Sequence, residues 1–100
     1  MQFTKMTIVT WAGPWAEKPE NKFIVDERDA LFAKMVEEGK TDGLAYTVNA
    51  TADPTDRSRA RKWVDQAAAE EFKTMITNLS AKYELPLISV VISDIPPELQ

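Results

Sequence analysis

Arg57-Ser-Arg-Ala-Arg-Lys-Trp-Val-Asp-Gln-Ala-Ala-Ala-Glu-Glu-Phe72 is the stretch of sequence that decides the fold. Its first eight residues predict an exposed basic strand, and the residues after Asp65 predict an amphipathic helix. Asp65 is the expected N-cap, because its short carboxylate can accept a hydrogen bond from a free backbone N–H of the first turn. The arginines of the strand are the one concentration of polar chemistry in the sequence.

The helix that starts at this cap is expected over residues 66–83. Its buried positions follow a period of 3.6 residues over four turns. They are Ala68, Phe72, Met75, Ile76, Leu79 and Tyr83. Pro86 prevents the helix from continuing. Residues 87–93 predict the last strand, which ends at Asp94-Ile-Pro-Pro.

The first half of the chain also contains two strands and a helix. Residues 3–11 alternate around β-branched side chains and predict a strand. A loop with two prolines (residues 12–22) then leads to a helix expected over residues 26–38 and capped by Asp26. Its apolar stripe is expected to be Leu31, Phe32, Met35 and Val36. Residues 44–51 predict a strand that pairs with residues 57–64 through a turn at residues 53–56.

The resulting order β-α-β-β-α-β predicts a single ferredoxin-like α+β domain over residues 1–100. Right-handed crossovers place two helices on one face of a four-stranded antiparallel sheet and leave the other face uncovered. We expect Ala60, Ile88, Val90 and Ile92 to face the helices. The uncovered face is then expected to carry Leu87, Ser89, Val91, Arg59, Arg61, Trp63 and either Trp11 or Thr10. This set is too apolar for a wet surface, so we expect a homodimer in which two sheets pack face to face.

Composition excludes several classes of chemistry. The chain has no Cys and no His, which rules out disulfides, thiolate catalysis, His-held haem or zinc, and Ser-His-Asp triads. We therefore expect no cofactor and no metal. No apolar run reaches the roughly 20 residues of a membrane span, and the N-terminus lacks the features of a signal peptide, so we expect a cytoplasmic protein. The net charge of −4 argues against nucleic-acid binding.

A short pattern after the basic strand resembles the dimeric α+β-barrel superfamily, which includes the antibiotic-biosynthesis-monooxygenase-like proteins. The pattern is a strand-ending tryptophan, an acid two residues later and a small residue three further on, here Trp63, Asp65 and Ala68. The resemblance implies a ferredoxin-like fold and a dimer. Monooxygenase-like members commonly carry a His where this chain has Phe72, which argues against their oxygenase and haem-degrading activities in this chain.

The arginines of the basic strand offer two interpretations. Arg57, Arg59 and Arg61 project to one side, about 6–7 Å apart. They predict either an anion clamp, because guanidinium groups grip carboxylate and phosphate bidentately, or a solvated strand end paired with glutamates. We favour solvation for Arg57 and weigh both interpretations equally for Arg59 and Arg61.

Other candidates have simpler structural explanations beside them. Trp11 and Trp63 are expected to border a ligand or to fill the core, and Trp15 is a candidate lid residue in its Gly-Pro-Trp loop. Tyr46 is a candidate proton donor or a core residue. Asn49, between two threonines, either binds a substrate oxygen or reflects β-propensity alone.

We therefore expect a protein that binds a small anionic organic molecule in a cavity at the dimer sheet face, held by Arg59, Arg61, Trp63, Trp11, Asn49 and Tyr46. One alternative is a cofactor-independent enzyme of the monooxygenase or isomerase type, in which Tyr46, Asn49 and the arginines polarise a carbonyl. Another is a structural or protein-interaction module. A cavity that remains at the sheet face after dimerisation distinguishes the first from the last.

Overall fold

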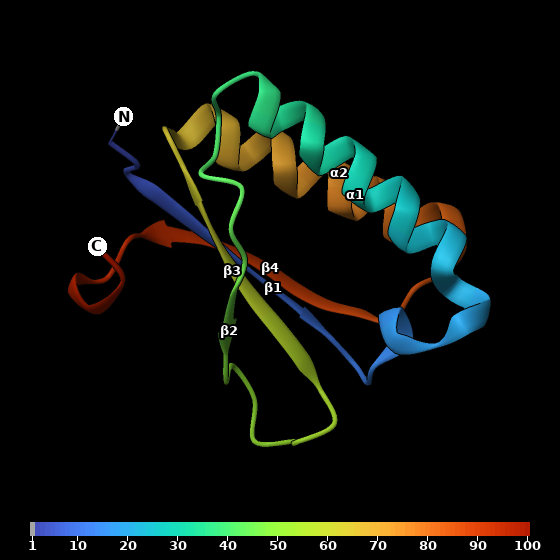
Figure 1. Ribbon diagram of the computed structural model, residues 1–100. Coiled ribbons are helices and arrows are strands. Elements are labelled where there is room, and N and C mark those ends of the chain that lie inside the picture. The colour runs from blue at the N-terminus through green and yellow to red at the C-terminus, as the bar shows by residue number, and fades with distance from the viewer. Residues whose placement is uncertain (1) are drawn as a thin grey trace.

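The computed structural model describes residues 2–100. Two helices pack on one face of a four-stranded antiparallel sheet (Figure 1). The strands are β1 (Lys5–Trp11), β2 (Tyr46–Val48), β3 (Arg57–Trp63) and β4 (Leu87–Asp94), and the helices are α1 (Lys22–Glu37) and α2 (Gln66–Tyr83). Single-turn 3-10 helices form η1 (Trp15–Glu17), η2 (Pro19–Asn21) and η3 (Pro97–Leu99). The strand order is β2-β3-β1-β4, so the predicted architecture is confirmed.

Helix α2 has the predicted boundaries. The Asp65 carboxylate accepts a hydrogen bond from the Ala68 backbone N–H at 2.9 Å, as a helix N-cap does. The helix stops where Glu84 turns to φ 51° and its N–H bonds to the Ser80 carbonyl. The buried positions are Ala68, Ala69, Phe72, Ile76 and Leu79. The predicted positions Met75 and Tyr83 are half-buried.

Helix α1 is longer than predicted, because it begins at Lys22 rather than at Asp26. The 3-10 turn η2, with Pro19 in its first turn, leads directly into it. The added turn buries Ile24. Met35 is buried and Phe32 half-buried, but Leu31 and Val36 are 39% and 38% exposed, so half of the predicted stripe is wrong.

The two edge strands differ from the predictions. Strand β2 covers residues 46–48 instead of 44–51. A bulge interrupts the pairing of β4 with β1, because Trp11 pairs with Leu87 while Thr10 pairs with Ser89. The additional residue in β4 is Ile88. Leu87 therefore packs against the helix-side core and Ile88 is 51% exposed, the reverse of our prediction. Val90 and Ile92 pack against the helix-side core, as predicted.

The face assigned to β3 is also reversed. Arg59, Arg61 and Trp63 lie under the helices, and Ala60 packs on the opposite face with Met6. Because side chains alternate along a strand, the position of one residue fixes the others. Trp63 is fully buried in the core beneath the helices, so the arginines at alternate positions face the same way. Trp11 lies on this side too, which leaves Thr10 on the uncovered side.

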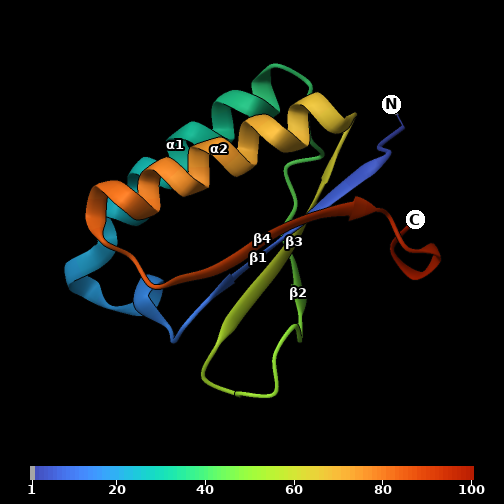
Figure 2. The same ribbon diagram turned by 180° about the vertical axis from the view of Figure 1, so that it is seen from behind.

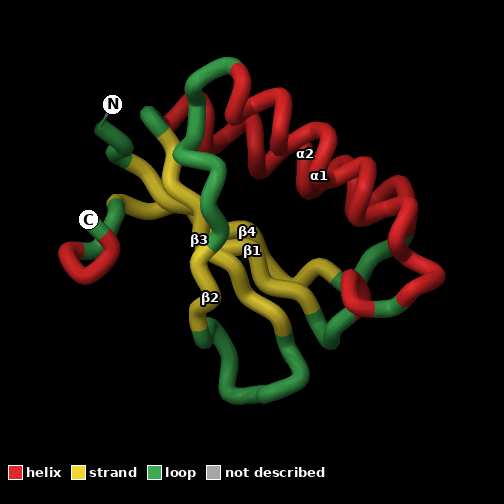
Figure 3. The backbone as a smooth tube through the Cα atoms, viewed as in Figure 1, coloured by secondary structure: helices red, strands yellow, loops and turns green. Residues whose placement is uncertain are grey.

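The two helices contact the sheet differently. Helix α2 packs directly on β1, β3 and β4, whereas the principal contacts of α1 are with α2, η1 and η2. Figures 2 and 3 show the helical layer on one side only, with β2 and its following loop projecting away from it. Helix α1 therefore has few direct contacts with the sheet, and the long side chain of Arg61 reaches from β3 to Phe32 on this helix.

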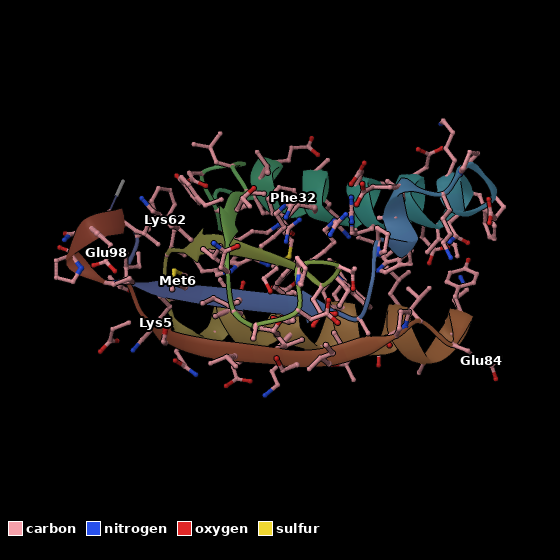
Figure 4. All side chains as sticks on the ribbon, turned by 90° about the horizontal axis from the view of Figure 1, so that it is seen from below. Lys5, Met6, Phe32, Lys62, Glu84 and Glu98 are labelled. Atoms are coloured by element: carbon pink, nitrogen blue, oxygen red, sulfur yellow. The ribbon has the colours of Figure 1, made fainter. Side chains whose placement is uncertain are left out.

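The end of the chain covers one end of the sheet. Ile95 and Leu99 pack with Met6 and Ala60 on the face without helices. In Figure 4, Glu98 lies at the same end of the sheet as Met6 and Lys62. In the described chain, residues 2–100, neither helix has the length and apolarity needed to cross a membrane.

Candidate functional site

A cavity of about 220 Å³ lies on the helix-covered side of β3, next to α1 and η1. Four arginines line it, three from β3 and one from α1: Arg57, Arg59, Arg61 and Arg28. Its apolar wall consists of Val9, Trp11, Trp15, Ala16 and Ile76, and Gly13, Glu17 and Ala45 complete the lining. The arginines that we expected on the uncovered face thus converge inside the molecule.

Two of the four arginines have carboxylate partners. The Arg57 Nε donates to Glu17 Oε2 at 2.6 Å and ties η1 to β3. Arg28 donates from Nε and Nη2 to Asp29 Oδ1, both at 3.2 Å. Arg59 donates from Nη1 to the Ser58 carbonyl at 3.0 Å. Among residues 2–100, no carboxylate lies within ion-pair distance of Arg59 or Arg61, so the cavity carries excess positive charge.

Arg61 is the most unusual of these side chains. It is 9% exposed, and its guanidinium lies 5.1 Å from the Phe32 ring centre and 5.3 Å from that of Phe72. Figure 4 marks the position of Phe32 on the α1 side. The Arg61 Nε is buried without a hydrogen-bond partner. Burial, reinforced by the positive charges of Arg28 and Arg59, lowers the pKa of Arg61 to about 10, so it is a cation at neutral pH.

Two tryptophans form one end of the cavity. Trp11 and Trp15 pack edge to face, with ring centres 5.1 Å apart. The Asn21 side chain donates to the Trp15 carbonyl at 2.8 Å and holds η1 against the start of α1. The Trp15 indole is 5% exposed and its Nε1 has no hydrogen-bond partner. Trp15 is therefore a fixed part of the wall in this conformation.

The remaining predicted residues lie elsewhere. Trp63 is fully buried and donates from Nε1 to Thr7 Oγ1 at 2.9 Å, which is a core role. Tyr46 packs on the uncovered face and its hydroxyl donates to Asp42 Oδ2 at 2.9 Å. This bond, with burial and the Asp42 charge, raises the pKa of Tyr46. Asn49 is exposed in the loop after β2.

The structure thus brings Arg59, Arg61 and Trp11 together, and it separates them from Trp63, Tyr46 and Asn49. It adds Arg28, which sequence reasoning missed. Arg28 is four residues after Ile24, and this spacing places it on the core-facing side of a helix that begins at Lys22. The predicted helix already included Arg28, and its position four residues before Phe32 of the predicted stripe was the signal that could have found it.

The lining is suited to holding an anion rather than to moving a proton. Arginine stays charged and donates only. Glu17, the carboxylate of the lining, has its pKa lowered by the hydrogen bond from Arg57, which keeps it ionised and paired. Among residues 2–100, no three acidic side chains gather closely enough to hold a metal ion.

Comparison with solved structures identifies the type of fold. No family model matches the chain, and no curated protein matches it. A hypothetical protein of Arabidopsis thaliana matches with a TM-score of 0.52 and 10% identity, over 97% of this chain and 89% of that one. A protein from an uncultured marine organism, described as a dimeric ferredoxin-like protein, matches with a TM-score of 0.51 and 6% identity, over 93% and 86% of the two chains. The fold is ferredoxin-like.

A third structure, from Pseudomonas aeruginosa, has 17% identity and a TM-score of 0.49 over 95% of this chain and 94% of its own. The similarity to the Arabidopsis thaliana and marine proteins, at 10% and 6% identity, concerns the fold alone. The function has to be inferred from the cavity itself.

Proposed function

We propose that the protein binds a small anionic organic molecule in the cavity beside α1, with Arg61 as the principal anchor of the anionic group. The single observation that supports this most strongly is the buried Arg61 Nε without a partner, in a cavity whose other unpaired charge, Arg59, is also positive. A buried cation without a counter-ion is costly, and a carboxylate in the cavity offsets that cost.

The surroundings of Arg61 are consistent with this role. The Phe32 and Phe72 rings hold the guanidinium in place without occupying its hydrogen-bond donors. A fixed planar guanidinium recognises a carboxylate through two parallel hydrogen bonds. Arg59 and Arg28 add positive charge next to it. At about 30 Å³ per water molecule, the cavity has room for roughly seven waters, which limits the ligand to about one ring or a short chain.

The proposal places the ligand between α1 and the sheet, not at the dimer sheet face where we expected it. The homodimer remains part of the proposal for a separate reason. Ile88 and Val91 are 51% and 50% exposed on strand β4, and one structural neighbour is described as a dimeric ferredoxin-like protein. A second copy is the occupant that we propose for the uncovered sheet face.

Titration with benzoate and its neutral analogue benzamide tests the ligand proposal. We expect benzoate to bind and benzamide to bind at least tenfold more weakly, because a hydrogen bond to a charged group contributes about 1.5–3 kcal/mol and each 1.4 kcal/mol is a factor of ten. The Arg61→Met variant should lose this preference. Lys62→Met is the matched control, since Lys62 is the next residue of β3 but lies over Tyr46 on the opposite face. Equal binding of benzoate and benzamide, or an unchanged preference in Arg61→Met, would refute the proposal.

Sedimentation tests the dimer independently. We expect a species of about twice the 11.3 kDa chain mass at micromolar concentration, and a Val91→Lys substitution should convert it to a monomer because a charge cannot be buried in an apolar interface without a partner. A wild-type monomer under these conditions would contradict this part of the proposal and leave the cavity unaffected.

A further inference from the structure

The cavity contains a second polar group that the anion does not explain. In the described part of the chain, two buried side-chain nitrogens have no hydrogen-bond partner, the Arg61 Nε and the Trp15 Nε1. Both residues line the same cavity. Buried polar groups in folded proteins nearly always have a partner, and each exception calls for an explanation. The proposed anion accounts for Arg61 and leaves Trp15.

The indole of Trp15 is held in place by its neighbours. It packs edge to face on Trp11, and Asn21 fixes its backbone carbonyl. An indole N–H is a donor only, and leaving one buried without an acceptor costs about 1–3 kcal/mol. A phenyl ring at this position would pack on Trp11 without that cost. The N–H therefore fits a site that receives an oxygen acceptor.

The two unpartnered donors come from different elements that line the cavity, Trp15 from η1 and Arg61 from β3. Trp11, on which Trp15 packs, pairs with Arg57 in the sheet, and Arg57 is four residues from Arg61 along β3. Four residues of a strand span roughly 13 Å. The side chains of Val9, Trp11 and Ile76 contribute to the apolar wall of the cavity. A molecule that satisfies both donors thus needs two polar groups and an apolar portion between them.

We infer, on the basis of the proposed function, that the ligand is an organic acid with a second, uncharged oxygen acceptor, a carbonyl or hydroxyl oxygen, which accepts a hydrogen bond from Trp15 Nε1 while the acid group binds Arg61. Trp15 is then the residue that selects oxygen-bearing acids over purely hydrocarbon acids. The neutral donor is important here, because a second cation would select a diacid instead.

Two acids of nearly equal shape test the inference. The keto group of 4-acetylbenzoate carries the oxygen acceptor that 4-isopropylbenzoate lacks. We expect the wild-type protein to bind 4-acetylbenzoate about 2–10-fold more tightly, as one neutral hydrogen bond contributes about 0.5–1.5 kcal/mol. Trp15→Phe should abolish this ratio and still bind both acids. Arg61→Met should weaken both acids and leave the ratio unchanged.

The indole N–H resonances of the wild-type protein, measured by NMR, give a readout that does not depend on whether a variant folds. The Trp15 Nε1 resonance should respond differently to the two acids in the wild-type protein, whereas that of Trp63, which already donates to Thr7, should respond equally to both. Equal affinities for the two acids, an equal response of Trp15 to both, or a ratio that persists in Trp15→Phe overturns the inference and leaves the proposed function standing. If neither acid binds while the benzoate titration also fails, both proposals fall.

Discussion

Replacing Arg61 with Met should make the ligand-free protein more stable. The charged guanidinium is desolvated, and lowering its pKa from the ordinary arginine value to about 10 corresponds to about 3 kcal/mol of destabilisation. Loss of the contacts with Phe32 and Phe72 offsets part of this gain, since a buried cation–π contact contributes about 2 kcal/mol. Met retains an unbranched apolar chain in the same space. We expect a net increase of about 1–2 kcal/mol in the free energy of unfolding.

Urea unfolding without added ligand measures this change. An unchanged slope of the unfolding free energy against urea concentration would show that the variant exposes as much surface on unfolding as the wild type does. The cost of burying the charged Arg61 side chain is fully present below its folded-state pKa of about 10. The stability gained by Arg61→Met should therefore be constant from neutral pH to about pH 10 and should decline at higher pH, as Arg61 loses its proton. Lys62→Met removes a half-buried cation from over the Tyr46 ring and should lower stability by no more than about 1 kcal/mol. A loss of 1 kcal/mol or more in Arg61→Met would show that the arginine supports the fold, and the reasoning from its burial would be wrong.

Three further predictions concern the frame around the cavity. Asp65→Ala should destabilise the protein by about 1 kcal/mol in urea unfolding, because the Ala68 N–H loses its acceptor, while Gln66→Ala should have little effect. Phe72→Ala should cost about 3–5 kcal/mol by calorimetry or urea, as Phe72 is fully buried, and a smaller loss would indicate that the core refills. The lowered pKa of Glu17 means that its pairing with Arg57 stabilises the fold above the ordinary glutamate pKa and is lost as the pH falls through the folded value. Glu17→Gln should therefore flatten the acid side of the stability profile, and an unchanged profile would contradict the pairing.

The sequence was sufficient to predict the order of elements and one helix to the residue. Helix α2 combines an acidic cap, a regular apolar period and a following proline, and each of these acts locally. The fold class follows from that order and from the handedness of the crossovers. The start of α1 was wrong because the 3-10 turn at Pro19 extends it, an effect of backbone geometry that the apolar pattern does not report.

Three of the six predicted site residues, Arg59, Arg61 and Trp11, line the cavity, but on the face opposite the predicted one. Alternation placed Arg59, Arg61 and Trp63 on one side of β3, which is correct, but the assignment of Ala60 to the helix side put them on the wrong face. In the folded chain, Trp63 is buried beneath the helices, so this side of β3 faces them. The bulge opposite Thr10 and Trp11 likewise reversed Leu87 and Ile88, and no residue in that stretch marks it. Long-range packing, rather than local propensity, decided these positions.

The inward row of arginines divides the electrostatics of the molecule into two regions of opposite sign. The chain has a net charge of −4 although four of its twelve cations line the cavity, so the outer surface is more acidic than the net charge indicates. An approaching anion is repelled once it comes within about 10 Å of the acidic outer surface, the Debye length at about 0.1 M salt, and is attracted only inside the cavity. Added salt should therefore speed association while changing the strength of the buried contact much less, which is the opposite of the behaviour of a protein that steers its ligand with surface charge.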